Sequence, residues 1–170
     1  MGYIMDLRKE LGHRPIIMAA AGVIVINDRN EVLLQKRADN GFWGLPAGSM
    51  ELGESFEECA RRELFEETGL TAGKLEICAT ESGKETHYIY PNGDEVYAAA
   101  VMYICREWSG EMKVQEEEIT EQRCQCVCDV YERPAQCDHF GRPHRWRGRH
   151  ALQQRAAQRM EGALLSMPHV

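Results

Sequence analysis

The stretch GSMELGESFEECARRELFEETGL, residues 48–70, carries most of what the sequence indicates about fold and chemistry. Ser55 and Glu58 form the Ser-x-x-Glu pattern of a capping box, in which each side chain satisfies a backbone donor at the start of a helix. Gly69 is well placed to end that helix in a left-handed conformation. An apolar stripe, one residue in every four, predicts which side of the helix enters the core: Phe56, Ala60 and Leu64.

Three glutamates of this predicted helix form a second pattern. Glu63 lies three residues before Glu66 and four before Glu67, so all three project from one side of adjacent turns. Like charges at this spacing destabilise a helix by a few tenths of a kcal/mol per pair, which a cation would offset. Oxygen ligands suit Mg²⁺, which takes one or two carboxylates together with waters and substrate phosphates. A solvated acidic face is the alternative.

The residues before and within the helix complete a pocket for a metal-bound polyphosphate. Arg62 is adjacent to Glu63 and is expected to orient its carboxylate. A backbone that approaches both a metal and a phosphate needs glycines, and the loop ending at Gly48 runs into Gly53 and Glu54 just before the helix. The combination favours a metal site over a bare acidic surface.

The whole stretch resembles the Nudix box. Gly48, five residues, Glu54, seven residues and then RELFEETGL at 62–70 match the box at every defined position. The flanking segments VLLQKR at 32–37 and GFWGLPAGSMELGES at 41–55 are similar to those of bacterial Nudix hydrolases. The resemblance covers roughly residues 16–120. It implies an α/β (α+β) fold with a mixed β-sheet sandwiched between helices.

The resemblance also implies hydrolysis of a nucleoside diphosphate linked to another group X, with Mg²⁺ or Mn²⁺ as cofactor. Glu63 and Glu67 would be the principal metal ligands, and Glu66 would bind a metal directly or through water. The carbonyl of Ala47 is a further candidate ligand. The supporting residues would be those of the loop and the neighbouring arginine: Gly48, Glu54 and Arg62.

The general base is not fixed within the family. Glu63 is one candidate, and a glutamate on a late loop is another. Residues 116–118 form such an acidic run, from which we select Glu118; a solvated turn is the alternative reading of this run.

Substrate choice depends on weaker signals. Arg37 is a candidate phosphate contact, since a guanidinium binds phosphate bidentately, or else a plain surface charge. Trp43 and Tyr88 are candidates for stacking on a base, although aromatic residues more often belong to the core. Family members that hydrolyse dinucleoside polyphosphates can carry a tyrosine where Tyr88 stands. The ADP-ribose subgroup usually has a proline where this chain has Glu85. X therefore stays open between a nucleotide, a nucleotide sugar and a dinucleoside polyphosphate.

The rest of the chain predicts strands joined by short turns. Residues 16–26 and 31–37 should form a hairpin around a turn at 27–30. Residues 42–48 should form an irregular loop, because glycine and proline punctuate them. A second hairpin should turn at Pro91–Asp94, whose Asn-Gly pair tolerates the positive φ angles of tight turns. The remaining predictions are a helix or a strand at 3–12 and strands at 75–79, 87–90 and 96–105.

Composition separates the chain into two parts. The formal charge is −7, yet residues 1–120 contain 22 acids against 12 bases, whereas the remainder is basic and rich in Cys and His. We therefore predict a Nudix domain at 1–122. The atypical tail at 123–170 either supplies a closing strand and C-terminal helix of the same domain, or is divergent or read out of frame. A zinc site at the Cys-x-Cys-x-Cys run and an RNA contact through the Arg cluster near Trp146 are minor alternatives.

The expected location and partners follow from the same features. The longest apolar run has 12 residues, against about 20 needed to cross a bilayer, so no membrane association is expected. The N-terminus lacks a secretory signal pattern, which places the protein in the cytoplasm. The expected partner is a small-molecule nucleotide; nucleic acid is not expected beyond the RNA alternative, and a homodimer is left open.

Overall fold

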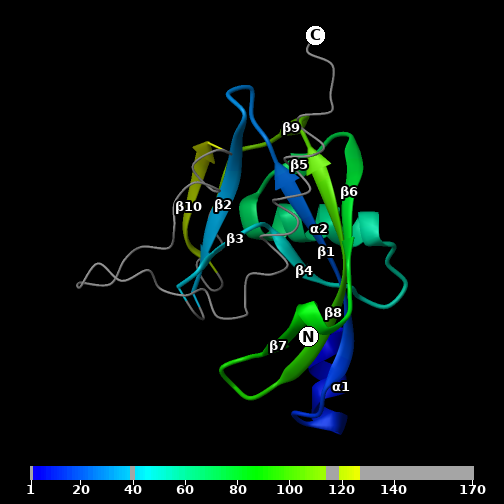
Figure 1. The fold of residues 1–170 in the computed structure, drawn as a ribbon. Helices are drawn as coiled ribbons and strands as arrows, with labels where there is room; N and C mark the ends of the chain where they lie inside the picture. Colours follow the sequence, from blue (N-terminus) through cyan, green and yellow to red (C-terminus); the bar gives the residue numbers. More distant parts are fainter. Residues whose placement is uncertain (1, 39–40, 114–118, 127–170) are drawn as a thin grey trace, which may run out of the picture.

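The computed structural model describes residues 2–38, 41–113 and 119–126 (Figure 1). Its elements in chain order are α1 (Tyr3–Leu11), β1 (Ile16–Val25), β2 (Glu31–Arg37), β3 (Trp43–Gly44), β4 (Ala47–Ser49), α2 (Phe56–Thr68), β5 (Thr71–Ala72), β6 (Leu75–Glu81), the 3-10 helix η1 (Lys84–Thr86), β7 (His87–Ile89), β8 (Glu95–Cys105), β9 (Trp108–Ser109) and β10 (Ile119–Cys126).

The larger sheet is mixed. Its strands follow the order β4-β1-β8-β6, and β7 pairs with β8 beyond the end of β6. β1 and β8 are parallel over their whole length, from Ile16 opposite Val96 to Val25 opposite Cys105, and the other pairings are antiparallel. Two long apolar strands at the centre account for this arrangement, since parallel strands have both faces covered and read as near-continuous hydrophobic runs. The fold is of the α+β class, as expected.

The predicted hairpin of residues 16–26 and 31–37 is wrong. The turn forms, with the Asn27 amide donating to the Glu31 carbonyl at 3.0 Å, but only the bridge between Ile26 and Val32 joins the two strands. Both edges of β1 are already occupied, by β4 and β8. β2 therefore diverges into a second sheet of order β10-β2-β3, visible beside the mixed sheet in Figure 1.

Helix α2 begins and ends where the sequence predicts. Ser55 and Glu58 make the reciprocal capping box, and Gly69 ends the helix with a φ of 73°. The helix lies across the mixed sheet (Figure 1), and its buried side joins a core cluster with β1 and β8. The members of that cluster on the helix are Cys59, Ala60 and Leu64, all fully buried. One face of α2 is thus fixed by packing, which leaves the opposite side to carry charge.

A second apolar cluster forms on the other face of the mixed sheet. It joins Ile24, Met102 and Ile104 of the mixed sheet to Val32 and Leu34 of β2. The second sheet is held against the first by this cluster on one side and by Leu33, which faces α2, on the other.

The other predicted elements have mixed outcomes. Residues 3–11 form a helix, and residues 91–94 form the turn of the β7–β8 hairpin. The loop predicted at 42–48 contains the short strands β3 and β4, because the backbone there pairs with β2 and β1.

Strand β10 runs to Cys126 and so crosses the predicted domain boundary at residue 122. The rest of the predicted tail, including the remaining cysteines, the Arg cluster and the terminal helix, lies outside the described residues. Across residues 2–38, 41–113 and 119–126, no helix has the length and apolar character that a bilayer crossing requires.

Candidate active site

Arg62 is the centre of a carboxylate cluster on the exposed side of α2. Its Nε and Nη2 atoms donate to the two oxygens of Glu54, at 2.5 and 2.9 Å. This bidentate pairing holds the loop before the helix against the helix itself, because Glu54 also accepts from the Glu51 amide at 2.8 Å. The hydrogen bonds from Arg62 lower the pKa of Glu54, which keeps this carboxylate ionised.

The remaining donors of Arg62 reach two predicted metal ligands. Its Nη1 donates to Glu63 Oε1 at 2.7 Å and to Glu66 Oε2 at 3.0 Å, and Nη2 donates to the Ser49 carbonyl at 3.0 Å. The contact expected between Arg62 and Glu63 is therefore present. The hydrogen bonds to Glu54 and then to Glu63 raise the pKa of Arg62, so one permanent positive charge holds three carboxylates.

Glu67 is held from the opposite direction, by the second sheet and β4. Its Oε2 accepts from Gln35 Nε2 at 2.6 Å and from the Ala47 amide at 3.1 Å. Only 4% of Glu67 is exposed, so this carboxylate is the buried end of the cluster, whereas 51% of the Glu66 side chain is exposed. Burial of a charge is tolerated here because two donors satisfy one of its oxygens.

Gly48 lies directly against Glu63. A Cβ atom built on Gly48 would overlap the carboxylate carbon and both oxygens of Glu63. Its backbone is not in the left-handed region, so the requirement for glycine is one of space rather than of φ. β4 can therefore bring the neighbouring Ala47 carbonyl, another predicted ligand, close to the acidic side of α2.

The donor set suits a hard divalent cation. Three carboxylates, Glu54, Glu63 and Glu66, pair with the single guanidinium of Arg62, and Glu67 adds a fourth negative charge that pairs with Gln35 instead, so the site has surplus negative charge. Carboxylate and carbonyl oxygens are the ligands that Mg²⁺ and Mn²⁺ take. In the arrangement described, Arg62 occupies an oxygen of both Glu63 and Glu66, and no group of three ligating side chains converges within the described ranges. The residues fit a metal by chemistry and charge, and their roles as ligands stay predictions.

Of the four predicted residues outside the box, three lie on three different strands, and one lies outside the described residues. Arg37 ends β2 opposite Ile119, and Trp43 lies in β3 with the Arg123 guanidinium 3.9 Å above its ring. Tyr88 lies in β7, where its ring meets Tyr90 edge-on. Glu118, the candidate base, lies outside the described residues. Trp43 also packs against the second apolar cluster, so it has a core role beside its predicted one.

Sequence reasoning missed the glutamines of the second sheet. Gln35 of β2 and Gln122 of β10 are partners in register, and both donate to Glu67: Gln35 to the carboxylate and Gln122 to the backbone carbonyl at 2.8 Å. The available signal was a glutamine inside EVLLQKR, where a buried strand would otherwise be apolar. Its partner on β10 could not be read from spacing, because 87 residues separate the two positions in the chain.

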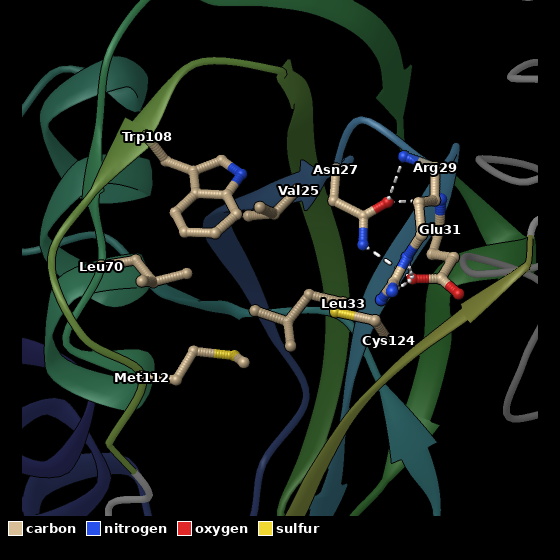
Figure 2. Close-up of a pocket in the computed structure, with 9 residues that line it drawn as sticks. All are labelled: Val25, Asn27, Arg29, Glu31, Leu33, Leu70, Trp108, Met112 and Cys124. Carbon is tan, nitrogen blue, oxygen red and sulfur yellow. Dashed lines mark hydrogen bonds and ion pairs between the residues drawn. The ribbon is translucent and has the colours of Figure 1, made fainter.

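A separate cavity of about 220 Å³ lies between the two sheets beyond the C-terminal end of α2. Figure 2 shows Trp108, Leu70 and Met112 on one side of it and the hydrogen-bonded Asn27, Arg29 and Glu31 on the other. Val25, Leu33 and Cys124 complete its lining. It contains none of the predicted site residues, so the carboxylate cluster and this cavity are distinct features.

Comparison with known proteins gives two curated relatives that match part of the chain. The chain is 52% identical over 52 residues to a putative 8-oxo-dGTP diphosphatase of Bacillus subtilis, covering 31% of this chain and 35% of that protein. It is 38% identical over 74 residues to an RNA pyrophosphohydrolase of Ruthia magnifica, covering 44% of this chain and 41% of that protein. The alignments thus span well under half of these curated relatives.

A solved structure and a family model extend the likeness over most of the chain. The crystal structure of the mutator protein MutT from Bacillus halodurans superposes with a TM-score of 0.56 at 27% identity, covering 66% of this chain and 71% of that one. The NUDIX domain model matches residues 17–140. The intact box, the mixed sheet and this match together show that the chain belongs to the NUDIX domain family.

Proposed function

We propose that the protein hydrolyses a pyrophosphate bond in a nucleoside diphosphate linked to X, with Mg²⁺ or Mn²⁺ as cofactor. The observation that carries the proposal is the pairing of Arg62 with three carboxylates, Glu54, Glu63 and Glu66, and the presence of a fourth, Glu67, on the same helix as Arg62. All of these residues stand at positions that match the family's box. Both curated relatives are named for the cleavage of phosphoric anhydrides, which supports the same reaction class.

The chain's own groups have distinct tasks in this reaction. Glu63, Glu66, Glu67 and the Ala47 carbonyl would hold the metal, which supplies polarisation of phosphoryl oxygens and a lowered pKa of bound water. Glu54 and Arg62 fix the loop and orient Glu63. Glu63 or Glu118 would take the proton of the attacking water as its oxygen bonds to phosphorus and the bridging P–O bond breaks. Arg37 would contact a phosphate, and Trp43 or Tyr88 the base.

A glutamate pair on α2 provides the test. Glu67→Gln keeps the size of a buried side chain but removes the charge, so we expect hydrolysis to fall by at least 100-fold while circular dichroism stays native. The matched control is Glu57→Gln, since Glu57 is on the same helix and only forms an exposed ion pair with Arg61. Full activity of the Glu67→Gln variant would contradict the assignment of Glu67 as a metal ligand.

The substrate has to be identified with a panel of candidate compounds, because the box indicates the reaction class but not the identity of the group X. The panel includes 8-oxo-dGTP and RNA, because the two curated relatives are named an 8-oxo-dGTP diphosphatase and an RNA pyrophosphohydrolase. ADP-ribose, nucleotide sugars and dinucleoside polyphosphates complete it. We expect metal-dependent release of a nucleoside monophosphate or of pyrophosphate from at least one of these. Hydrolysis of the pyrophosphate bond at an RNA 5′ end is the second candidate, supported by the 38% identity to the Ruthia protein over 74 residues. Saturable nucleotide binding without release of product would indicate a sensing module.

A further inference from the structure

We propose that Gln35 is a positioning residue that orients the Glu67 carboxylate for metal binding, and this inference rests on the proposed function. Gln35 belongs to β2 of the second sheet, outside the box and 32 residues before its partner. Its Nε2 donates to Glu67 Oε2 at 2.6 Å, and both residues are buried, with 2% and 4% exposed.

The contact determines the direction of the carboxylate. Glu67 Oε2 accepts from Gln35 on one side and from the Ala47 amide on the other, so two donors hold one oxygen and fix the plane of the group. Ala47 is also the residue whose carbonyl is a predicted ligand, so the same hydrogen bond sets the spacing between two candidate metal donors. Partners of this kind orient metal ligands and raise their effective affinity.

The cost of Gln35 supports a functional reason for its presence. Its Oε1 is buried and accepts no hydrogen bond from the described residues. The Oε1 atom of Gln122 also lacks such a partner, but Gln122 as a whole is only partly buried, whereas Gln35 is 2% exposed. A buried polar atom without a partner destabilises the folded state, because it loses its hydrogen bonds to water on folding. An apolar residue would avoid that cost within a strand whose neighbouring positions, Val32, Leu33 and Leu34, are buried and apolar. Local departures of this kind are expected at functional positions.

Gln122 provides a matched control. It has the same side chain, lies beside Gln35 in the sheet and donates to the same glutamate, but to the backbone carbonyl of Glu67 rather than to the carboxylate. A purely structural role of the two glutamines predicts similar effects from both. A positioning role predicts that only the Gln35 substitution alters the metal site.

The experiment measures Mn²⁺ binding to the full chain by electron paramagnetic resonance, without substrate. We expect Gln35→Met to weaken Mn²⁺ binding by about 10–100-fold, whereas Gln122→Met binds within about twofold of the wild type. Gln35→Asn, one methylene too short to reach Glu67, should behave as Gln35→Met and serves if the latter fails to fold. In a Glu67→Gln background, Gln35→Met should add no further loss.

The outcomes separate the two proposals. If the wild type binds Mn²⁺ and the Gln35 variants bind it equally well or more tightly, the positioning role is overturned and the proposed function stands. An equal loss in the Gln122→Met variant also overturns it, since the effect would then be structural. If the wild type does not bind Mn²⁺ at all, the proposed function fails and this inference fails with it.

Discussion

Gly48 illustrates how a missing side chain shapes the carboxylate cluster. The residue pairs with Ala21 in the mixed sheet while its α-carbon faces the Glu63 carboxylate. The φ angle of Gly48 lies outside the left-handed region, so the backbone conformation does not require a glycine at this position. The reason is that the Glu63 carboxylate occupies the space that a Cβ of Gly48 would fill. The hydrogen bond from the neighbouring Ala47 amide to Glu67 shows that β4 also reaches the acidic side of α2 at this point.

Gly48→Ala should therefore displace Glu63 rather than unfold the protein. The new methyl group must push the Glu63 carboxylate away from Arg62 or separate β4 from the helix. We expect hydrolysis to fall at least tenfold and Mn²⁺ binding to weaken, with a smaller effect on the melting temperature. Ser49→Ala is the control, because it leaves the Ser49 carbonyl that accepts from Arg62 intact. Unchanged activity in Gly48→Ala would show that Glu63 can move without consequence.

At the scale of the element, α2 serves two purposes on two faces. Cys59, Ala60 and Leu64 enter the core, and burial raises the pKa of the Cys59 thiol to about 12, so this cysteine stays protonated and acts as a small apolar residue. The opposite side presents like charges that would weaken an isolated helix. The buried apolar contacts of α2 and the capping box at the start of this helix compensate for the repulsion.

The capping box can be tested independently of the chemistry. Ser55 Oγ accepts from the Glu58 amide at 3.2 Å, and Glu58 accepts in return from the Ser55 amide at 2.8 Å. Ser55→Ala removes the first bond and should cost about 1 kcal/mol of unfolding free energy. The melting temperature should fall by about 2–4 °C, with the KM for the nucleotide unchanged. Ser82→Ala is the control, because Ser82 is exposed and lies outside the helices and strands, so the melting temperature should stay unaltered. An equal fall in this variant would show that loss of the cap is not the cause.

Local patterns were predictable from the sequence, and long-range pairings were not. Ser55 and Glu58 at one end of α2, and Gly69 at the other, each interact with residues only three or four positions away. The local sequence alone therefore locates both ends of the helix. Whether β2 pairs with β1 depends instead on which strands already occupy the edges of β1, and those strands come later in the chain. Gln35 was missed for the same reason, since its partner Glu67 lies 32 residues further along the chain and meets it only in the tertiary structure.

At the scale of the whole molecule, α1 is fastened to the distant β7–β8 hairpin by polar contacts. Arg8, which is buried, donates to the carbonyls of Gly12, Arg14 and Glu95, and its Nε lies 3.7 Å from Asp94. His13 Nδ1 lies 2.8 Å from the other oxygen of Asp94. These bonds join the N-terminal helix to a turn some 80 residues further along the chain, so this end of the molecule depends on charge rather than on an apolar core.

The polar contacts between α1 and the β7–β8 hairpin should make the stability of the protein depend on pH. The hydrogen bond with His13 is the main cause that lowers the pKa of Asp94 below its ordinary value of 3.8. A lowered pKa in the folded state means that the stabilisation is complete above the ordinary value and is lost as pH falls through it to the folded pKa. Asp94→Asn should therefore destabilise the protein by about 1 kcal/mol at pH 7, and the difference from the wild type should shrink below about pH 4.

Urea unfolding of both proteins at pH 7 and at pH 3 measures this difference. Asp6→Asn is the control, because Asp6 is an exposed carboxylate of the same helix that pairs only with the nearby Lys9. A difference between wild type and Asp94→Asn that is as large at pH 3 as at pH 7 would contradict the assignment.

The parallel pairing of β1 with β8 has a consequence for the order in which the chain can be assembled. β1 is complete once residue 25 has been synthesised, but the strand that covers one of its edges ends only at Cys105. During synthesis, that edge therefore presents unpaired amides and carbonyls along ten mostly apolar residues, the kind of surface on which other chains add as strands. We therefore expect the nascent chain to be most prone to aggregation in this interval, until β8 has been synthesised and pairs with β1.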